Sequence, residues 1–206
     1  MTHSASSSTS RAPREPGPAA RRAIGATCLL LLVFFGCSTD DSGGLDDSCL
    51  AFVPSQQRTD GEVTAVLAAD SSCDLAILEL VVTGVSDVWS VQFELDYPIA
   101  LSQFAFIDTA SSFLVDDGTP PLFHAEDNPL GHLVVGVSRQ NTGSNTGVTP
   151  TEDDNVLVRL GFVRFANSGE GLLMFMNPSL STLTVAGEQP TELLVPFHAG
   201  SFVIEN

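Results

Sequence analysis

Three short acidic clusters contain the residues of this 206-residue chain that could bind a metal ion. Calcium is held by several carboxylate and carbonyl oxygens, and such clusters supply them. The clusters are Asp116-Asp117, Glu126-Asp127-Asn128 and the run of Glu152, Asp153, Asp154 and Asn155. None has the spacing of an EF-hand loop, so each can also be interpreted as a solvated turn. The run from 152 to 155 is the candidate calcium ligand set, and no other cofactor is expected.

Residue types used in catalysis are present, but they form no recognisable motif. His124, His132 and His198 are far apart, and no His-x-x-x-His or Cys-His spacing indicates zinc. No serine lies in a nucleophile-elbow motif. Paired carboxylates for glycoside hydrolysis cannot be picked out of 25 acidic residues without geometry. We therefore expect that the protein is not an enzyme.

A long polar segment, residues 138–155, is a candidate for ligand contact. It reads SRQNTGSNTGVTPTEDDN, and loops of this length in compact domains are either mobile or functional. Arg139, Gln140 and Asn141 at its start could hydrogen-bond a glycan or a partner peptide. The alternative interpretation is a surface loop without a binding role.

The β-strand that would position further ligand-binding side chains is predicted at residues 89–97. Its odd positions are apolar and its even positions are polar: Trp89, Val91, Phe93, Leu95 and Tyr97 against Ser90, Gln92, Glu94 and Asp96. A period of two predicts a half-buried β-strand. Gln92 and Glu94 then face solvent and are further candidate ligand-binding residues. The single Trp and the single Tyr of the chain fall on the core side, so no planar aromatic strip for crystalline polysaccharide is expected.

The remaining pattern is also β. Short apolar runs alternate with Gly, Asn, Asp and Pro turns, and no long stretch has a helical period. The expected strands cover 50–53, 63–69, 75–82, 104–107, 122–125, 133–138, 156–165, 172–176, 180–185, 193–197 and 202–204. About ten short strands in one domain predict an all-β fold, a single β-sandwich over residues 49–206.

The N-terminal part indicates export. Residues 1–20 are rich in Ser, Pro, Ala and Arg, and Arg21-Arg22 precedes an apolar run that ends at Gly36. Residues 1–36 are therefore interpreted as a leader and signal peptide. The sequence VFFGC, ending at Cys37, resembles the lipobox of bacterial lipoproteins, which implies that Cys37 is lipidated and that residues 37–48 are a flexible acidic tether. An uncleaved anchor helix, or a cysteine that merely falls within the signal, are the alternatives.

Cysteine usage and charge restrict the surroundings and partners of the domain. Cys49 and Cys73 are left for the exported domain, and an even remainder outside the cytoplasm predicts a disulfide worth roughly 3 kcal/mol. The formal net charge is −17 and the chain contains 8 basic residues. Nucleic-acid binding is excluded, because phosphate affinity depends on basic clusters.

Residues 80–98, LVVTGVSDVWSVQFELDYP, resemble the early strands of cohesin domains. Later pieces follow in the same order: Ser112-Phe113-Leu114, GHLVVGVS at 131–138, the run 156–165 and a final strand over 200–204. The resemblance covers roughly residues 50–206 and implies a jelly-roll sandwich related to carbohydrate-binding modules. One departure is the order Asp96-Tyr97-Pro98, where the family usually has Tyr-Asp-Pro.

These observations together predict a non-catalytic binding module of cohesin-like fold, anchored to a membrane of the bacterial cell envelope, with the outer membrane or cell surface favoured. Its partner would be a polysaccharide or a dockerin-like protein. A structural or assembly lipoprotein of the envelope is the competing hypothesis, and an accessory of a glycan-active enzyme is a third.

Overall fold

The computed structural model describes residues 49–115, 118–140 and 145–205. Several predicted features lie outside these residues, namely the signal peptide over 1–36, Cys37, the tether over 37–48, the pair Asp116-Asp117 and Asn141. In the described ranges every regular element is a β-strand, so none of them contains a helix that could cross a membrane.

Thirteen strands follow one another in the described residues. They are β1 (Leu50–Pro54), β2 (Glu62–Leu67), β3 (Leu75–Thr83), β4 (Val88–Asp96), β5 (Ser102–Asp108), β6 (Leu122–Asn128), β7 (His132–Ser138), β8 (Val156–Arg164), β9 (Gly169–Leu172), β10 (Met174–Thr182), β11 (Thr191–Leu193), β12 (Phe197–His198) and β13 (Gly200–Ile204).

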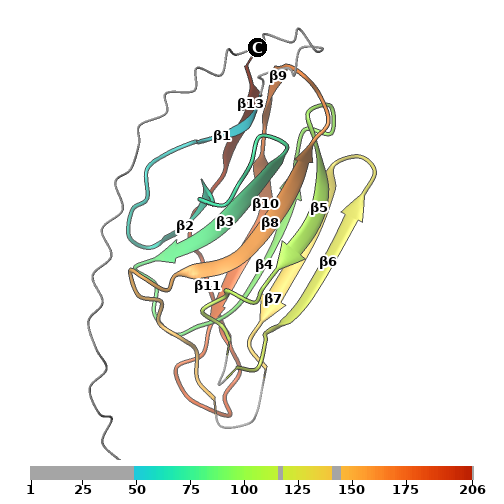
Figure 1. The fold of residues 1–206 in the computed structure, drawn as a ribbon. Helices are drawn as coiled ribbons and strands as arrows, with labels where there is room; N and C mark the ends of the chain where they lie inside the picture. Colours follow the sequence, from blue (N-terminus) through green and yellow to red (C-terminus); the bar gives the residue numbers. More distant parts are fainter. Residues whose placement is uncertain (1–48, 116–117, 141–144, 206) are drawn as a thin grey trace, which may run out of the picture. The chain divides into compact units, whose positions relative to one another are not determined.

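Two five-stranded sheets form the layers of a sandwich (Figure 1). The strand order is β12-β2-β3-β8-β5 in one sheet and β11-β10-β4-β7-β6 in the other. A third, small sheet has the order β1-β13-β9. Leu173 alone separates β9 from β10, and Ala199 alone separates β12 from β13, so the small sheet continues into both layers. The prediction of an all-β, single jelly-roll sandwich is confirmed.

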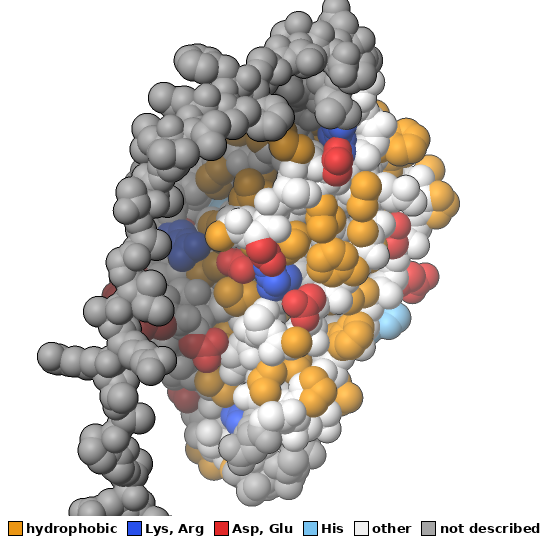
Figure 2. Space-filling view, in the orientation of Figure 1, with side chains coloured by type: hydrophobic (Ala, Val, Ile, Leu, Met, Phe, Trp, Pro, Cys, Tyr) orange, Lys and Arg blue, Asp and Glu red, His pale blue; other side chains and the backbone are white. Residues whose placement is uncertain are grey.

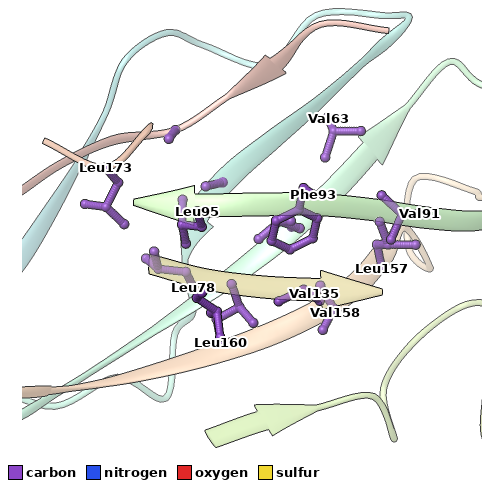
Figure 3. Close-up of a cluster of buried hydrophobic side chains, with 14 of the residues drawn as sticks. Val63, Leu78, Val91, Phe93, Leu95, Val135, Leu157, Val158, Leu160 and Leu173 are labelled. Atoms are coloured by element: carbon purple, nitrogen blue, oxygen red, sulfur yellow. The ribbon is translucent and has the colours of Figure 1, made fainter. Parts of the chain in front are cut away.

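The core lies between the two large sheets, and β4 supplies its centre (Figure 3). Val91, Phe93 and Leu95 point inward from β4, as their two-residue spacing predicts. They face Leu78 of β3 and Leu160 of β8, which come from the opposite sheet (Figure 3). All five side chains are buried, so this contact holds the two layers together.

Aromatic rings extend this core along the sandwich. Phe162 of β8 lies edge to face with Phe202, at 5.2 Å between centroids, and with Tyr97, at 5.3 Å. Phe93 makes a similar contact with Phe175 of β10 at 5.3 Å. Such pairs add about 0.5–1.5 kcal/mol each beyond their burial. The predicted burial of Tyr97 is thus confirmed.

Trp89 is buried as predicted, but it does not belong to the central cluster. Thr182 of β10 pairs with Val88 and Ser181 pairs with Ser90, so Trp89 is an extra residue in β4. Such a bulge shifts the alternation of side chains. Val88 joins the central cluster in place of Trp89.

The separate strands predicted at 172–176 and 180–185 are wrong, because β10 runs through both as one strand. Asn177 and Pro178, which suggest a turn in the sequence, form a bulge opposite Phe93. Asn177 has a positive φ of 47°, which asparagine adopts more readily than most residues. A bulge also accommodates a proline that cannot donate a ladder hydrogen bond.

The predicted disulfide between Cys49 and Cys73 is present. It joins the start of β1 to the turn before β3. Beside it, the backbone N–H of Leu50 donates to the carbonyl of Cys73 at 3.0 Å. The covalent link and this hydrogen bond together fix the first strand of the small sheet to a strand of a large one.

Candidate binding face

Four neighbouring strands expose a continuous surface, which we call the β4 face. Alternation sends every second side chain of each strand away from the core. The face consists of Ser90, Gln92, Glu94 and Asp96 of β4, His132, Val134, Gly136 and Ser138 of β7, Leu122, His124, Glu126 and Asn128 of β6, and Met174, Met176, Ser179 and Ser181 of β10. Gln92 and Glu94, both predicted to bind ligand, lie in its middle.

The strand register arranges these residues in rows across the sheet. One row is His124, Gly136, Gln92 and Ser179, and the next is Glu126, Val134, Glu94 and Met176. Neighbouring strands are about 4.8 Å apart, so side chains in a row are regularly spaced. The surface is therefore a grid of side chains, which suits a broad partner better than a small molecule.

A shallow depression interrupts this grid at Gly136. It has a volume of about 350 Å³, and its lining includes Ser90, Gln92, Leu122, His124 and the exposed Phe123. A Cβ atom at Gly136 would have no heavy atom within 4 Å. The depression therefore exists because one position of the grid lacks a side chain, and it can receive a side chain from a partner.

Exposed apolar side chains lie at two margins of the β4 face. Met174 and Met176 on β10 are 50% and 42% exposed, and Leu122 on β6 is 60% exposed. Thioether side chains are flexible and polarisable, and they adapt to the surface of a partner. Desolvation of these groups would favour association.

One compact group of charges lies on the face around His132. Its Nδ1 donates to Oδ1 of Asp96 at 2.6 Å, and its Nε2 is 3.5 Å from Oε2 of Glu94. The hydrogen bond to Asp96 raises the pKa of His132, and the charges of Asp96 and Glu94 act in the same direction. The sixteen residues of the face include three carboxylates, Glu94, Asp96 and Glu126, and no Lys or Arg, so the face is acidic with His132 in either form.

Several polar side chains on the face have no hydrogen-bonding partner among the described residues. In the ranges that the structure describes, the side chains of Ser90, Gln92, Ser179 and Ser181 make no hydrogen bond with another described residue. All four are at least partly exposed. Their donors and acceptors are therefore available to a partner.

The outer face of the opposite sheet differs, because its charges are paired with one another (Figure 2). Arg159 of β8 contacts Asp70, and it lies 3.3 Å from Glu79 and 3.7 Å from Asp108. The hydrogen bond from Arg159 lowers the pKa of Asp70. Charges already bound to each other offer less to a protein partner than the open groups of the β4 face.

Arg139 and Gln140, also predicted to bind ligand, hold neighbouring backbone in place. Nη1 of Arg139 donates to the carbonyl of Thr146 at 2.6 Å, and Nε2 of Gln140 donates to that of Pro120 at 2.9 Å. Both follow β7 at the end of the β4 face. The structure thus does not bring their side chains onto the grid beside Gln92 and Glu94.

The predicted calcium loop forms a tight turn before β8. The side chain of Asn155 donates to the carbonyl of Glu152 at 3.3 Å, and the N–H of Thr151 donates to the carbonyl of Asp154 at 3.0 Å. Glu152, Asp153 and Asp154 are exposed. Among the described residues no group of three or more His, Cys, Asp or Glu side chains could hold a metal ion. Calcium binding here stays a prediction, which titration with calcium would test.

Comparison with solved structures shows a cohesin-like fold. The sixth cohesin of scaffoldin B from Acetivibrio cellulolyticus, solved with a mutant Cel5 dockerin, matches with a TM-score of 0.53 and 15% identity, over 69% of this chain and 97% of that chain. CaCohA2 from Clostridium acetobutylicum matches with a TM-score of 0.48 and 12% identity, over 65% and 89% of the two chains. Type II cohesin A11 from Bacteroides cellulosolvens matches with 0.47 and 12%, over 76% and 97%.

The comparison with solved structures confirms the cohesin-like jelly roll that the sequence pattern predicts. No protein-family model matches the sequence, and no curated protein matches it either. The domain is thus recognisable by the arrangement of its strands.

Sequence reasoning missed two features of the β4 face. Met174 and Met176 have the i, i+2 spacing of one strand face, which could have placed them together. Their position beside β4 depends on the pairing of β10 with β4, which joins residues about 80 apart and has no local signal. In the sequence, Gly136 is one small residue within an apolar strand. The depression above it forms only because larger side chains from β4 and β6 lie beside it in the same row.

Proposed function

We propose that the domain is a non-catalytic binding module that docks a dockerin-like protein on the β4 face. The observation that carries this proposal is the open grid itself. Polar side chains such as Ser90 and Gln92 line the depression at Gly136, and exposed methionines lie at the β10 margin of the face, while the opposite sheet pairs the charges of Arg159 internally. Protein interfaces combine such apolar anchors with a hydrogen-bonding rim.

The composition of the face favours a protein over a polysaccharide. Sugar rings stack on exposed aromatic side chains, and the sixteen residues of the β4 face include no Trp, Tyr or Phe; the single exposed Phe in the lining of the depression is Phe123. Methionine, serine and glutamine in a flat sheet suit a helix or another sheet that brings its own side chains. The negative charge of Glu94, Asp96 and Glu126 further favours a partner with basic residues.

The comparisons support the same type of partner. The Acetivibrio cellulolyticus cohesin that shares this fold was solved in complex with a dockerin. At 15% identity the comparison shows a shared fold and not a shared binding surface. The surface that binds a partner must therefore be identified by experiments on this chain.

A binding titration with two matched arginine variants tests the proposal. The Cel5 dockerin is the first probe, followed by dockerin-like proteins encoded in the same genome. Gly136→Arg fills the depression without a steric clash, because a Cβ there meets only open space. We expect it to weaken binding at least tenfold, about 1.4 kcal/mol.

Val163→Arg is the control, because Val163 is exposed on the opposite sheet. It adds the same side chain and the same charge, and we expect it to leave the affinity unchanged. Equal loss in both variants would point to charge alone. Failure of every dockerin-like protein to bind would favour a structural role in the envelope.

We also propose that the module is exported and held at a bacterial membrane by a lipid on Cys37. The basic, apolar and Gly-Cys order of the N-terminal sequence supports this part of the proposal. Cys37→Ala should release the protein from the membrane fraction or leave the precursor uncleaved. Unchanged fractionation and unchanged mass would contradict the lipid anchor.

A further inference from the structure

β5 and β6, the last strands of their sheets, lie side by side at one edge of the sandwich (Figure 1). Residues of both strands line a second cavity there. Its volume is about 290 Å³. The lining residues are Tyr97, Ile99, Gln103, Asp127, Pro129 and Phe165, together with Ser102. From this cavity we infer a ligand site that is independent of the β4 face and of the partner proposed there. We propose that it binds a single ring of a neutral saccharide.

The walls of this cavity are fixed by backbone contacts. The N–H of Tyr97 donates to the carbonyl of Gly131 at 2.8 Å, and the N–H of Phe165 donates to that of Leu101 at 2.8 Å. Gly131 packs so closely that a Cβ there would lie 2.5 Å from the side chain of Ile99. The two turns that form the walls are thus locked together, and a preformed site loses little entropy when it binds.

The polar groups of the cavity can both donate and accept hydrogen bonds. The hydroxyl of Tyr97 donates to Oδ1 of Asp127 at 2.9 Å, which orients the carboxylate and leaves its other oxygen as an acceptor. Burial raises the pKa of Tyr97 to about 12, and the bond to Asp127 acts in the same direction, so the hydroxyl stays protonated. Gln103 is exposed and adds an amide with donors and an acceptor.

The apolar side of the cavity offers an exposed ring. Phe165 is 71% exposed, and Ile99 is 46% exposed beside it in the lining. A pyranose ring has the matching character, because one face presents C–H groups and the rim presents hydroxyls. An aromatic ring beside a carboxylate and an amide can therefore contact both parts of one sugar residue.

The size and charge of the site favour one neutral ring. Ligand sites for larger molecules run from about 300 to 1,000 Å³, so this cavity is at the lower limit. Asp127 is the single charged side chain in the lining of the cavity. One carboxylate oxygen of Asp127 already accepts a hydrogen bond from the hydroxyl of Tyr97. The other polar groups are neutral, which suits hydroxyls better than an organic cation.

Saturation-transfer NMR on the intact protein tests this site. The probes are methyl β-D-glucopyranoside, methyl β-D-xylopyranoside and N-acetylglucosamine, with tetramethylammonium chloride as the cation probe. We expect at least one saccharide to bind. Phe165→Ala should weaken that binding about tenfold, because the ring that faces the sugar is lost. Gln103→Ala should weaken it as well.

Leu194→Ala is the matched control, because Leu194 is an exposed apolar side chain near Asp87, at the other end of β4 from Tyr97. It should leave saccharide binding unchanged, and all three variants should melt like the wild type because the altered residues are exposed. No binding by any of the three saccharides would overturn the proposal. So would equal binding by Phe165→Ala, or binding of tetramethylammonium in preference to the sugars.

Discussion

Neighbouring residues in β4 have opposite surroundings, and this contrast connects the fold to the proposed function. Phe93 is fully buried between the sheets, whereas Gln92 beside it is exposed at the centre of the β4 face. One strand therefore supplies both the core and the binding surface. The alternation of apolar and polar residues along the sequence was enough to predict that Phe93 is buried and that Gln92 is exposed. Trp89 is also buried as predicted, but the bulge formed with the partner strand places Val88 instead of Trp89 in the central cluster.

Replacing Phe93 with alanine should destabilise the domain strongly. The substitution removes buried aromatic surface and leaves a cavity beside Phe175, at a cost of about 3–5 kcal/mol. That is a large share of the 5–15 kcal/mol of a typical domain, on the order of half. Chemical denaturation of Phe93→Ala and the wild type measures the difference.

Gln92→Ala is the control for this prediction. Exposed polar positions usually change stability by less than about 0.5 kcal/mol, so its unfolding curve should match that of the wild type. Equal destabilisation by both substitutions would mean that β4 is buried on both sides. The β4 face would then have to be abandoned.

His132 should make the stability of the domain depend on pH. Its folded pKa is raised above the ordinary 6.5 by the hydrogen bond to Asp96 and by the charges of Asp96 and Glu94. A raised folded pKa means that this stabilisation is complete below the unfolded pKa of 6.5 and is lost as pH rises through the folded value. Melting temperatures between pH 5.5 and about 9 should therefore fall at the upper end.

His132→Gln isolates that contribution, because glutamine is uncharged across the range. The difference in melting temperature between wild type and variant should be largest at the acidic end of the range and shrink as pH rises, as expected for a histidine whose folded pKa is raised. A constant difference across the range would show that the ion pairs with Asp96 and Glu94 add no stability.

At the level of strands, the local sequence pattern predicted the positions of strands well. It failed where the pairing between two strands determined where a strand begins or ends. β4 and β7 agree with their predicted positions within a residue because alternation and turn residues mark them. The prediction divided this region into strands at 172–176 and 180–185, with Asn177 and Pro178 between them. In the structure Asn177 and Pro178 form a bulge, since β4 pairs with β10 both before and after them.

The disulfide should stabilise the connection between β1 and β3. Closing the 24-residue separation between Cys49 and Cys73 is worth about 3 kcal/mol in the chain-entropy model. The double variant Cys49→Ser/Cys73→Ser should unfold at correspondingly lower denaturant, and adding a reductant should not affect it further.

The wild type in reductant is the comparison for this prediction, and it should behave like the double variant. The pairing of β1 with β13 should survive, because its five register pairs do not include either cysteine. A loss of stability below about 0.5 kcal/mol would show that the reduced chain is already restrained in this region.

For the whole molecule, the sequence predicted the class of fold and placed Gln92 and Glu94 on an exposed strand face, but it could not assemble the rest of either site. The sandwich follows from strand patterns that are local. The grid of the β4 face and the cavity between β5 and β6 depend on which strands become neighbours, as with Gly136 beside Gln92 or Tyr97 beside Asp127. Such contacts join distant parts of the chain, and periodicity within a strand carries no information about them.

The methyl groups of Met174 and Met176 provide the most direct test of the central claim, that a dockerin-like partner docks on the β4 face. The chain has three methionines, and the third is Met1. Selective ¹³C labelling of methionine methyl groups therefore gives a spectrum in which two reporters lie on this face. Both signals should shift or broaden when a partner that binds the intact protein is added. Binding that leaves both signals unchanged, with the partner at saturation, would contradict the assignment of the β4 face.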